Sequence, residues 1–124
     1  MSEGPKRKYT IYAVDFDGTL VENAPPNYDT YRPNMYLINH LIKRRKAGNK
    51  VILWTCRTGE RLKNAVAFAK SVGLEFDAVN ENLPEIIEYF GGKSSRKVFA
   101  DIYIDDKANN KPKYHVPYKE SDNL

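Results

Sequence analysis

Two acidic segments, each directly after an apolar run, carry the residue types of this chain that are best suited to chemistry. They are residues 15–20, DFDGTL, and residues 102–106, IYIDD. Two carboxylates about 4 Å apart repel each other by about 4 kcal/mol at an effective dielectric constant of about 20. If both apolar runs end at one place, their four aspartates predict a site that holds a divalent cation.

The apolar runs belong to a series of short predicted strands. The strands are expected at residues 9–14, 51–54, 76–79 and 101–104. The first two runs lack the alternation of a half-exposed strand, which predicts burial on both faces. Helices with one apolar stripe are predicted between the strands, at residues 33–47, 62–72 and 84–90.

Alternating strands and helices predict an α/β fold with a parallel sheet, because right-handed crossovers place all strand ends along one edge. Open α/β sheets bind ligands at the edge formed by the C-terminal ends of their strands. We therefore expect Asp15, Asp17, Thr55, Asp105 and Asp106 to converge there, although they are distant in the sequence.

The length and composition suit one domain over residues 1–124, with a core at about 9–108 and a tail at 109–124. With 41% hydrophobic side chains, such a domain buries roughly two thirds of its unfolded surface. No apolar segment is long enough to cross a membrane, and residues 1–8 do not resemble a signal peptide, so we expect a cytoplasmic protein without a membrane partner. The single cysteine, Cys56, agrees with a reducing compartment, and a formal charge of +4 attracts phosphate only modestly.

Asp15 and Asp17 stand one residue apart at the end of a strand, and Gly18 lets the backbone turn and reorient the second carboxylate. One carboxylate can then attack a substrate while the other handles a proton. An ordinary surface turn is the alternative for Asp-x-Asp-Gly taken alone, but the buried strand before it favours a site. A calcium-binding EF-hand loop is excluded, because Leu20 and Pro26 stand where it needs glycine and glutamate.

The two acidic segments, together with Thr55 at the end of the second predicted strand, resemble the haloacid dehalogenase superfamily of phosphotransferases. The resemblance covers about residues 9–108, and its first and last motifs are specific in combination. The chain is most similar to the small, capless members found in bacteria and bacteriophages, in which Trp-Thr-x-Arg and Ile-Asp-Asp-Lys/Arg recur. The resemblance implies a Rossmann-like three-layer sandwich with the strand order 3-2-1-4 and no cap domain.

The resemblance also implies a role for each acidic residue. Asp15 would accept the phosphoryl group as an aspartyl-phosphate. Asp17 would protonate the leaving oxygen and then activate water, which needs a carboxyl group with a pKa near the working pH. Mg²⁺ would be held by the Asp15 carboxylate, the Asp17 backbone carbonyl and the last motif. Asp106 is favoured as the direct ligand with Asp105 behind it, and the reverse assignment stays open.

Further residues follow from the same resemblance. Thr55 and the backbone amides after it would bind the phosphoryl oxygens at the start of a helix. The family also uses a lysine to offset charge, for which we expect Lys97, with Lys93, Lys107 and Arg57 as alternatives. A straight strand would carry Lys97 about 25 Å from the site at about 3.3 Å per residue, so this assignment needs a short strand. Contacts with the substrate are expected from Gly18, Thr19, Cys56 and Arg57.

These expectations describe a Mg²⁺-dependent phosphomonoester hydrolase for a small phosphorylated metabolite, such as a nucleotide or a sugar phosphate. Removal of phosphate from nucleic-acid ends is an alternative that the basic runs at residues 6–8 and 43–46 favour. A non-catalytic metal-binding or assembly module is a third hypothesis, although metal binding alone would not need the Asp17 side chain. The few residues where larger relatives insert a lid predict an open site, which a second subunit could cover.

Overall fold

The structure of the chain is a computed structural model that describes residues 7–23, 26–92 and 98–105. The elements in these ranges are, in chain order, β1 (Ile11–Val14), β2 (Val21–Glu22), β3 (Arg32–Pro33), α1 (Met35–Lys46), β4 (Lys50–Leu53), α2 (Gly59–Ser71), β5 (Ala78–Val79), α3 (Pro84–Tyr89) and β6 (Ile102–Ile104). The predicted α/β class is confirmed. None of the helices in the described ranges is both long and apolar enough to span a membrane.

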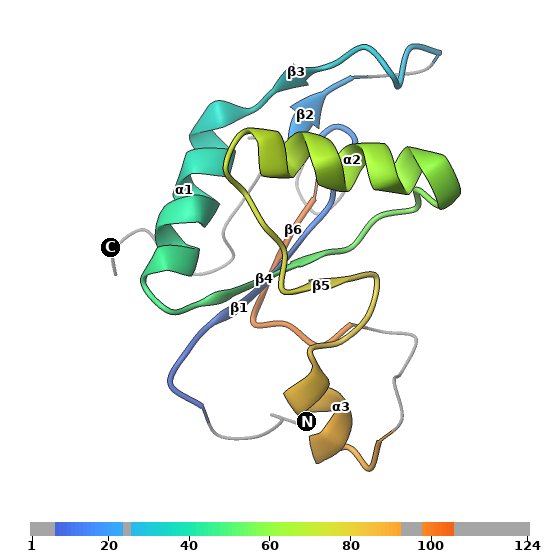
Figure 1. Cartoon of the computed structure of the whole chain (residues 1–124). Helices are drawn as coiled ribbons and strands as arrows, with labels where there is room; N and C mark the ends of the chain where they lie inside the picture. Colours follow the sequence, from blue (N-terminus) through green and yellow to red (C-terminus); the bar gives the residue numbers. More distant parts are fainter. Residues whose placement is uncertain (1–6, 24–25, 93–97, 106–124) are drawn as a thin grey trace.

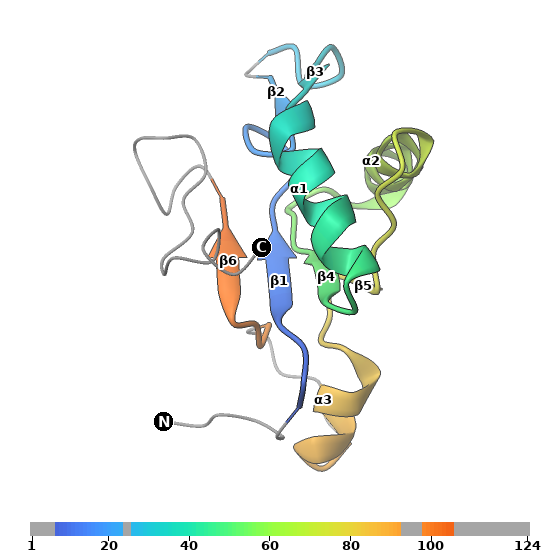
Figure 2. The same cartoon turned by 90° about the vertical axis from the view of Figure 1, so that its left-hand side faces the viewer.

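A four-stranded sheet forms the centre of the fold, with its strands in the order β5-β4-β1-β6. β1 pairs with β4 on one side and with β6 on the other, β5 pairs with β4, and all three pairings are parallel. Figure 2 shows β6, β1 and β4 side by side and pointing the same way. The prediction of a parallel sheet is therefore confirmed, and the C-terminal ends of its strands lie along one edge.

Helices lie on both faces of the sheet, and alternate residues of β1 are buried on each face. In Figure 1, α1 and α2 lie above the sheet and α3 lies below it. Tyr12 and Val14 belong to a larger buried cluster that includes side chains of α1 and α2. Ile11 and Ala13 belong to a smaller cluster with Ile86 of α3. These layers make the fold Rossmann-like, and they confirm that β1 is buried on both faces.

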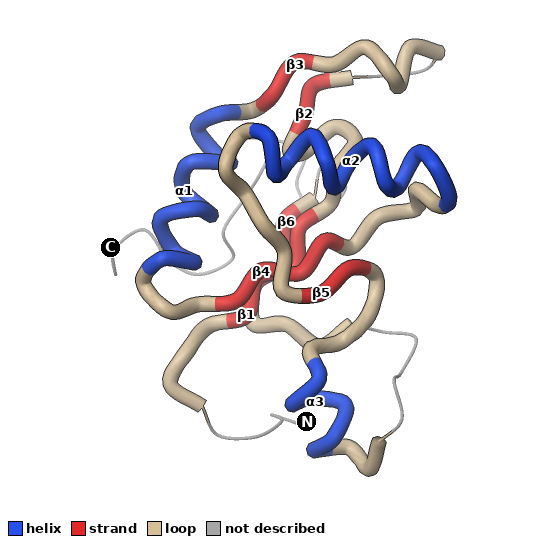
Figure 3. Tube along the Cα trace, viewed as in Figure 1, coloured by secondary structure: helices blue, strands red, loops and turns tan. Residues whose placement is uncertain are grey.

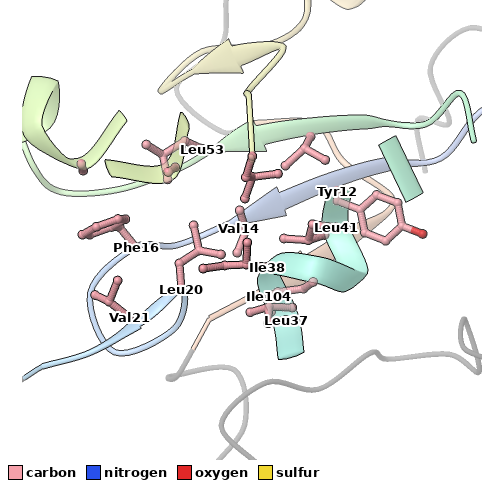
Figure 4. Close-up of a cluster of buried hydrophobic side chains, with 14 of the residues drawn as sticks. Tyr12, Val14, Phe16, Leu20, Val21, Leu37, Ile38, Leu41, Leu53 and Ile104 are labelled. Atoms are coloured by element: carbon pink, nitrogen blue, oxygen red, sulfur yellow. The ribbon is translucent and has the colours of Figure 1, made fainter. Parts of the chain in front are cut away.

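The larger cluster anchors the strand that leads to the first acidic segment. Figure 4 shows Leu37, Ile38 and Leu41 of α1 close to Val14 of β1. The three α1 side chains are at most 1% exposed. Burying an aliphatic side chain of this size contributes about 1.5–3 kcal/mol. Because β1 is held in this way, the position of Asp15 directly after it is well defined.

The first helix begins at Met35, and the prediction that Pro33 is its first residue is wrong. Pro33 lies in β3, where it pairs with Val21. Asn34 is the N-cap of α1, and its side-chain oxygen accepts a hydrogen bond from Leu37 N at 3.2 Å. The asparagine side chain satisfies one of the backbone amides that a helix leaves without a partner at its start.

A short antiparallel ribbon of β2 and β3 connects β1 to α1, in a region where the sequence predicts neither a strand nor, before residue 33, a helix. Val21 pairs with Pro33, and Glu22 pairs with Arg32. Figure 3 shows the ribbon apart from the main sheet, beyond the C-terminal ends of the sheet strands. The ribbon therefore lies on the same side of the molecule as the predicted site. It was not predicted, because strands of two residues are too short to produce a periodic hydrophobic pattern.

Candidate functional site

Three predicted site residues stand at the C-terminal ends of three neighbouring strands. Asp15 follows β1, Asp105 follows β6, and Thr55 lies just beyond β4. Asp15 N donates to Ile104 O at 3.0 Å, and Trp54 N donates to Val14 O at 2.9 Å. These backbone bonds extend the sheet pairing past the strand ends. Asp15 is thereby placed between the strand end that leads to Asp105 and the one that leads to Thr55.

The backbone turns sharply after Asp17, as the glycine at position 18 predicts. Gly18 has a φ of 76°, which L-residues with side chains rarely adopt. Its amide donates to Asn23 Oδ1 at 2.9 Å. The carbonyl of Phe16 accepts bonds from the amides of Thr19 and of the two residues after it. The turn separates the directions of the two acidic residues, because Asp15 continues the strand and Asp17 lies inside the turn.

The Asp17 carboxylate is bound by the guanidinium group of Arg57. Arg57 Nε donates to Asp17 Oδ2 at 2.9 Å, and Arg57 Nη2 donates to Asp17 Oδ1 at 2.7 Å. Asn23 Nδ2 donates to Asp17 Oδ1 as well, at 2.7 Å. The Arg57 side chain is 4% exposed and that of Asp17 is 26% exposed. The result is a largely buried, two-point ion pair directly beside the strand end that carries Asp15.

Arg57 was expected to contact the substrate, but its side chain is turned into the protein. Its Nη2 also donates to Tyr28 O at 2.9 Å, and its Nη1 donates to Arg61 O at 3.2 Å. The guanidinium carbon lies 4.8 Å from the ring centroid of Phe16 and 5.9 Å from that of Tyr31. Cationic groups over aromatic faces are attracted to them. Through these contacts the Arg57 side chain connects Asp17 to two backbone carbonyls and two aromatic rings.

The ion pair moves the pKa of Asp17 in the direction opposite to the expected tuning. Burial raises the pKa of the Asp17 carboxyl, but hydrogen bonds from Arg57 and Asn23 and the charge of Arg57 outweigh it, and the pKa lies below its ordinary value. The hydrogen bond to Asp17 likewise raises the pKa of Arg57. Asp17 is therefore a carboxylate at neutral pH, which suits a proton acceptor better than a proton donor.

The loop after β4 is organised around the Thr55 side chain. Thr55 N donates to Asn80 Oδ1 at 2.8 Å, and Thr55 Oγ1 accepts from Arg57 N at 3.2 Å. Asn80 has a φ of 55°, a conformation that asparagine tolerates better than most residues. Thr58 is the N-cap residue of α2 but makes no side-chain capping bond. The Thr55 hydroxyl keeps its own hydrogen, so it can donate to an anion bound at this edge.

The oxygen donors at the strand ends fit Mg²⁺. Within residues 7–23, 26–92 and 98–105, no three acidic, histidine or cysteine side chains lie close enough together to hold a metal ion. Mg²⁺ is usually held by one or two carboxylates together with water and substrate phosphate. Asp15 and Asp105 each follow one of two paired strands, whose backbones lie about 4.8 Å apart, and these two carboxylates would be the ligands of such an ion. The Asp17 carboxylate is engaged by Arg57, which leaves its backbone carbonyl for the predicted metal role.

Several predicted residues are not brought to the edge of the site or lie outside the described part of the chain. Thr19 is 1% exposed, and its hydroxyl has no hydrogen-bond partner among the described residues. Cys56 is exposed next to Thr55. β6 is short, as the Lys97 assignment requires. Four of the predicted site residues lie outside the described ranges: Lys93, Lys97, Asp106 and Lys107.

Two asparagines with a part in the site were not foreseen from the sequence. Asn23 bonds both to the Asp17 carboxylate and to the Gly18 amide. Asn80 accepts the Thr55 amide from a position 25 residues further along the chain. Asparagine is an ordinary loop residue, so only its place just after a predicted strand could have drawn attention to Asn80.

The chain was compared with known proteins in three ways. No protein-family model and no curated protein matches it. A solved structure of a conserved protein from Bacteroides thetaiotaomicron is similar, with 36% sequence identity and a TM-score of 0.67. The similarity covers 81% of this chain and 78% of the Bacteroides chain. The chain therefore belongs to the same protein family as this conserved Bacteroides protein.

Proposed function

We propose that this protein is a Mg²⁺-dependent phosphomonoester hydrolase of the haloacid dehalogenase type, which acts through an aspartyl-phosphate on Asp15. The observation that carries the proposal is the position of Asp15. It follows β1, a fully buried strand paired on both sides, and stands between the strand ends that lead to Thr55 and Asp105. A nucleophile, a phosphate-binding hydroxyl and a second carboxylate at one sheet edge are the groups that such a reaction needs.

In the first step, an Asp15 carboxylate oxygen attacks phosphorus, and the bond from phosphorus to the leaving oxygen breaks. The electron pair of the broken bond stays on the leaving oxygen, which takes a proton from solvent water. The Thr55 hydroxyl donates a hydrogen bond to a phosphoryl oxygen and so holds the phosphoryl group in position for attack. Asp15, the Asp17 carbonyl and Asp105 would hold Mg²⁺, with Asp106 as a further ligand from the same motif. When bound, the ion would offset negative charge on the phosphoryl group.

In the second step, water attacks the phosphorus of the aspartyl-phosphate and releases inorganic phosphate. Asp17 serves this step as the proton acceptor, because Arg57 keeps its carboxylate ionised. The same ion pair opposes the first part of the predicted role of Asp17, protonation of the leaving oxygen. The geometry thus supports Asp17 as a general base more strongly than as a general acid.

A small phosphorylated metabolite, such as a nucleotide or sugar phosphate, is the substrate class that we favour over a nucleic-acid end. The basic residues in the last turn of α1 are partly committed to contacts within the protein. Arg44 Nε donates to the Tyr12 hydroxyl at 2.8 Å, and Arg45 pairs with Asp77 at 3.0 Å. Side chains engaged in this way contribute less to binding a nucleic-acid backbone. The capless form of the superfamily fits the short β2–β3 connection between β1 and α1.

Hydrolysis of an aryl phosphate with and without Mg²⁺ tests the proposal. We expect turnover with Mg²⁺, its loss when EDTA is added, and its loss in Asp15→Asn. Glu88→Gln is a control, because Glu88 is exposed and lies in α3, on the opposite face of the sheet from α1 and α2. Unchanged turnover in Asp15→Asn would rule out the mechanism.

A further inference from the structure

The ion pair between Arg57 and Asp17 is the most densely bonded contact at this edge of the sheet. We propose that Arg57 is a positioning residue, which holds the Asp17 carboxylate in the orientation that takes a proton from the water attacking the aspartyl-phosphate on Asp15. The inference rests on the proposed function and deepens it. It assigns Arg57 to Asp17 and to the second step, in place of the substrate contact that the sequence suggests.

Both oxygens of the Asp17 carboxylate are held by Arg57. The two bonds, of 2.9 Å and 2.7 Å, come from Nε and Nη2 of one planar guanidinium group. Asn23 adds a third donor at 2.7 Å. Parallel bonds from a rigid fork fix the rotation of a carboxylate as well as its position. Asp17 is thus oriented by its partners.

The Arg57 side chain is buried and makes hydrogen bonds and ring contacts in addition to its bonds with Asp17. The residue is 6% exposed, and its guanidinium group lies against the rings of Phe16 and Tyr31. Its remaining donors bind the carbonyls of Tyr28, at 2.9 Å, and Arg61, at 3.2 Å. Swinging the side chain out to a bound phosphate would break all of these contacts together. The arrangement therefore favours an orienting role over direct contact with substrate.

In the second step, water releases the phosphoryl group from Asp15 and restores the Asp15 carboxylate. The water oxygen forms a bond to phosphorus, and the bond between phosphorus and the Asp15 oxygen breaks. The electron pair of the broken bond returns to the Asp15 carboxylate. One proton of the water passes to the Asp17 carboxylate, the other stays on the released hydrogen phosphate, and Asp17 then loses its proton to solvent.

An orienting role distinguishes arginine from lysine. Lysine carries a compact ammonium group without the fork that binds two carboxylate oxygens in parallel. Arg57→Lys retains the charge near Asp17 but loses this two-point geometry. A loss of activity in Arg57→Lys would thus come from orientation, whereas a role of charge alone would be preserved.

The test combines a double-mutant cycle with detection of the phosphoenzyme. Arg57→Gln, Asp17→Asn and the double variant are assayed with an aryl phosphate and Mg²⁺ for kcat and KM. Covalent phosphate is measured by intact mass spectrometry of protein quenched with acid during turnover. Arg57→Lys is included, and Arg32→Gln is the matched control, because the Arg32 side chain is 86% exposed and pairs with Glu22 at 3.7 Å.

We expect Arg57→Gln to lower kcat by about 10²-fold and to lower KM with it, so that kcat/KM changes by less than about threefold, because only the second step is slowed. Arg57→Lys should also lower kcat, and Arg32→Gln should stay within about twofold of the unaltered protein. Phosphoenzyme should accumulate in Arg57→Gln and Asp17→Asn, because the second step is slowed. In the Asp17→Asn background, Arg57→Gln should lower kcat by less than about threefold, since the group that it positions is already disabled.

An equal loss of kcat from Arg57→Gln in both backgrounds, or no accumulation of phosphoenzyme, would overturn the inference. If circular dichroism shows that Arg57→Gln does not fold, Arg57→Lys and Asn23→Ala decide the question. Arg57→Lys keeps a basic side chain at the buried position, and Asn23→Ala keeps Arg57 itself. Unchanged kcat in both variants would also overturn the inference. If the unaltered protein neither hydrolyses the ester nor forms phosphoenzyme, the proposed function itself is wrong and this inference falls with it.

Discussion

Replacing Arg57 by methionine should destabilise the fold more than replacing Asp17 by asparagine. Methionine retains most of the packing against Phe16 and Tyr31 but removes every hydrogen bond that the guanidinium group donates. Asparagine retains the shape of Asp17 and one acceptor oxygen. In Asp17→Asn, Arg57 keeps its bonds to two backbone carbonyls and its contacts with two aromatic rings.

The magnitudes follow from the burial of each partner. Breaking a fully buried ion pair costs about 3–5 kcal/mol. The Asp17 side chain is 26% exposed, and Asn23 still donates to it, so its share is smaller. We assign about 2 kcal/mol to the loss of the pair and about 1 kcal/mol to each lost bond to the carbonyls of Tyr28 and Arg61. Arg57→Met should therefore cost about 4 kcal/mol and Asp17→Asn about 2 kcal/mol.

Urea unfolding at pH 7 measures these differences. The fluorescence of Trp54, the single tryptophan, and far-ultraviolet circular dichroism should report the same transition if unfolding is two-state. The double variant should cost about as much as Arg57→Met alone, because the pair can be lost only once. Arg32→Gln, at a side chain that is 86% exposed, should change the free energy of unfolding by less than about 0.5 kcal/mol. A double variant that loses the sum of the two single costs would refute the coupling on which this reasoning depends.

Two further predictions concern acid and a helix cap. Because the pKa of Asp17 is lowered in the folded protein, its stabilising contribution is complete above the ordinary aspartate pKa and is lost as the pH falls through the folded pKa. The acid limb of stability, followed by urea unfolding from pH 7 down to about pH 3, should therefore be shallower in Asp17→Asn than in the unaltered protein. Asn34→Ala should cost about 1 kcal/mol in thermal or urea unfolding through loss of the α1 cap, whereas Asn39→Ala, at an exposed position within the helix, should cost nothing measurable.

The sheet and the placement of its strand ends could be predicted because the strands are buried on both faces. In β1, Ile11, Tyr12, Ala13 and Val14 are all buried, and burial of this kind leaves a continuous apolar run in the sequence. Where such a run stops at an acidic residue, the parallel topology alone decides which edge of the sheet receives it. The position of Asp15 therefore follows from local pattern and general rules of topology.

The direction of the Arg57 side chain could not be predicted in the same way. Its partner Asp17 lies 40 residues earlier in the chain, and its other acceptors are backbone carbonyls that no sequence pattern marks. A basic residue near a predicted phosphate site is most simply interpreted as a phosphate ligand. Only the three-dimensional contacts show that the guanidinium group faces the protein interior.

The same contacts tie the segment between β1 and α1 to the chemistry of the site. Arg57 and Asn23 both donate to the carbonyl of Tyr28, and both also bind the Asp17 carboxylate. The ring of Tyr31 packs against Phe16, which lies between the two acidic residues of the first segment. A change in this connection that altered access of a substrate to the sheet edge would therefore also move Asp17. Under the proposed function, access and proton transfer would be coupled, because one buried guanidinium group binds both the Tyr28 carbonyl and the Asp17 carboxylate.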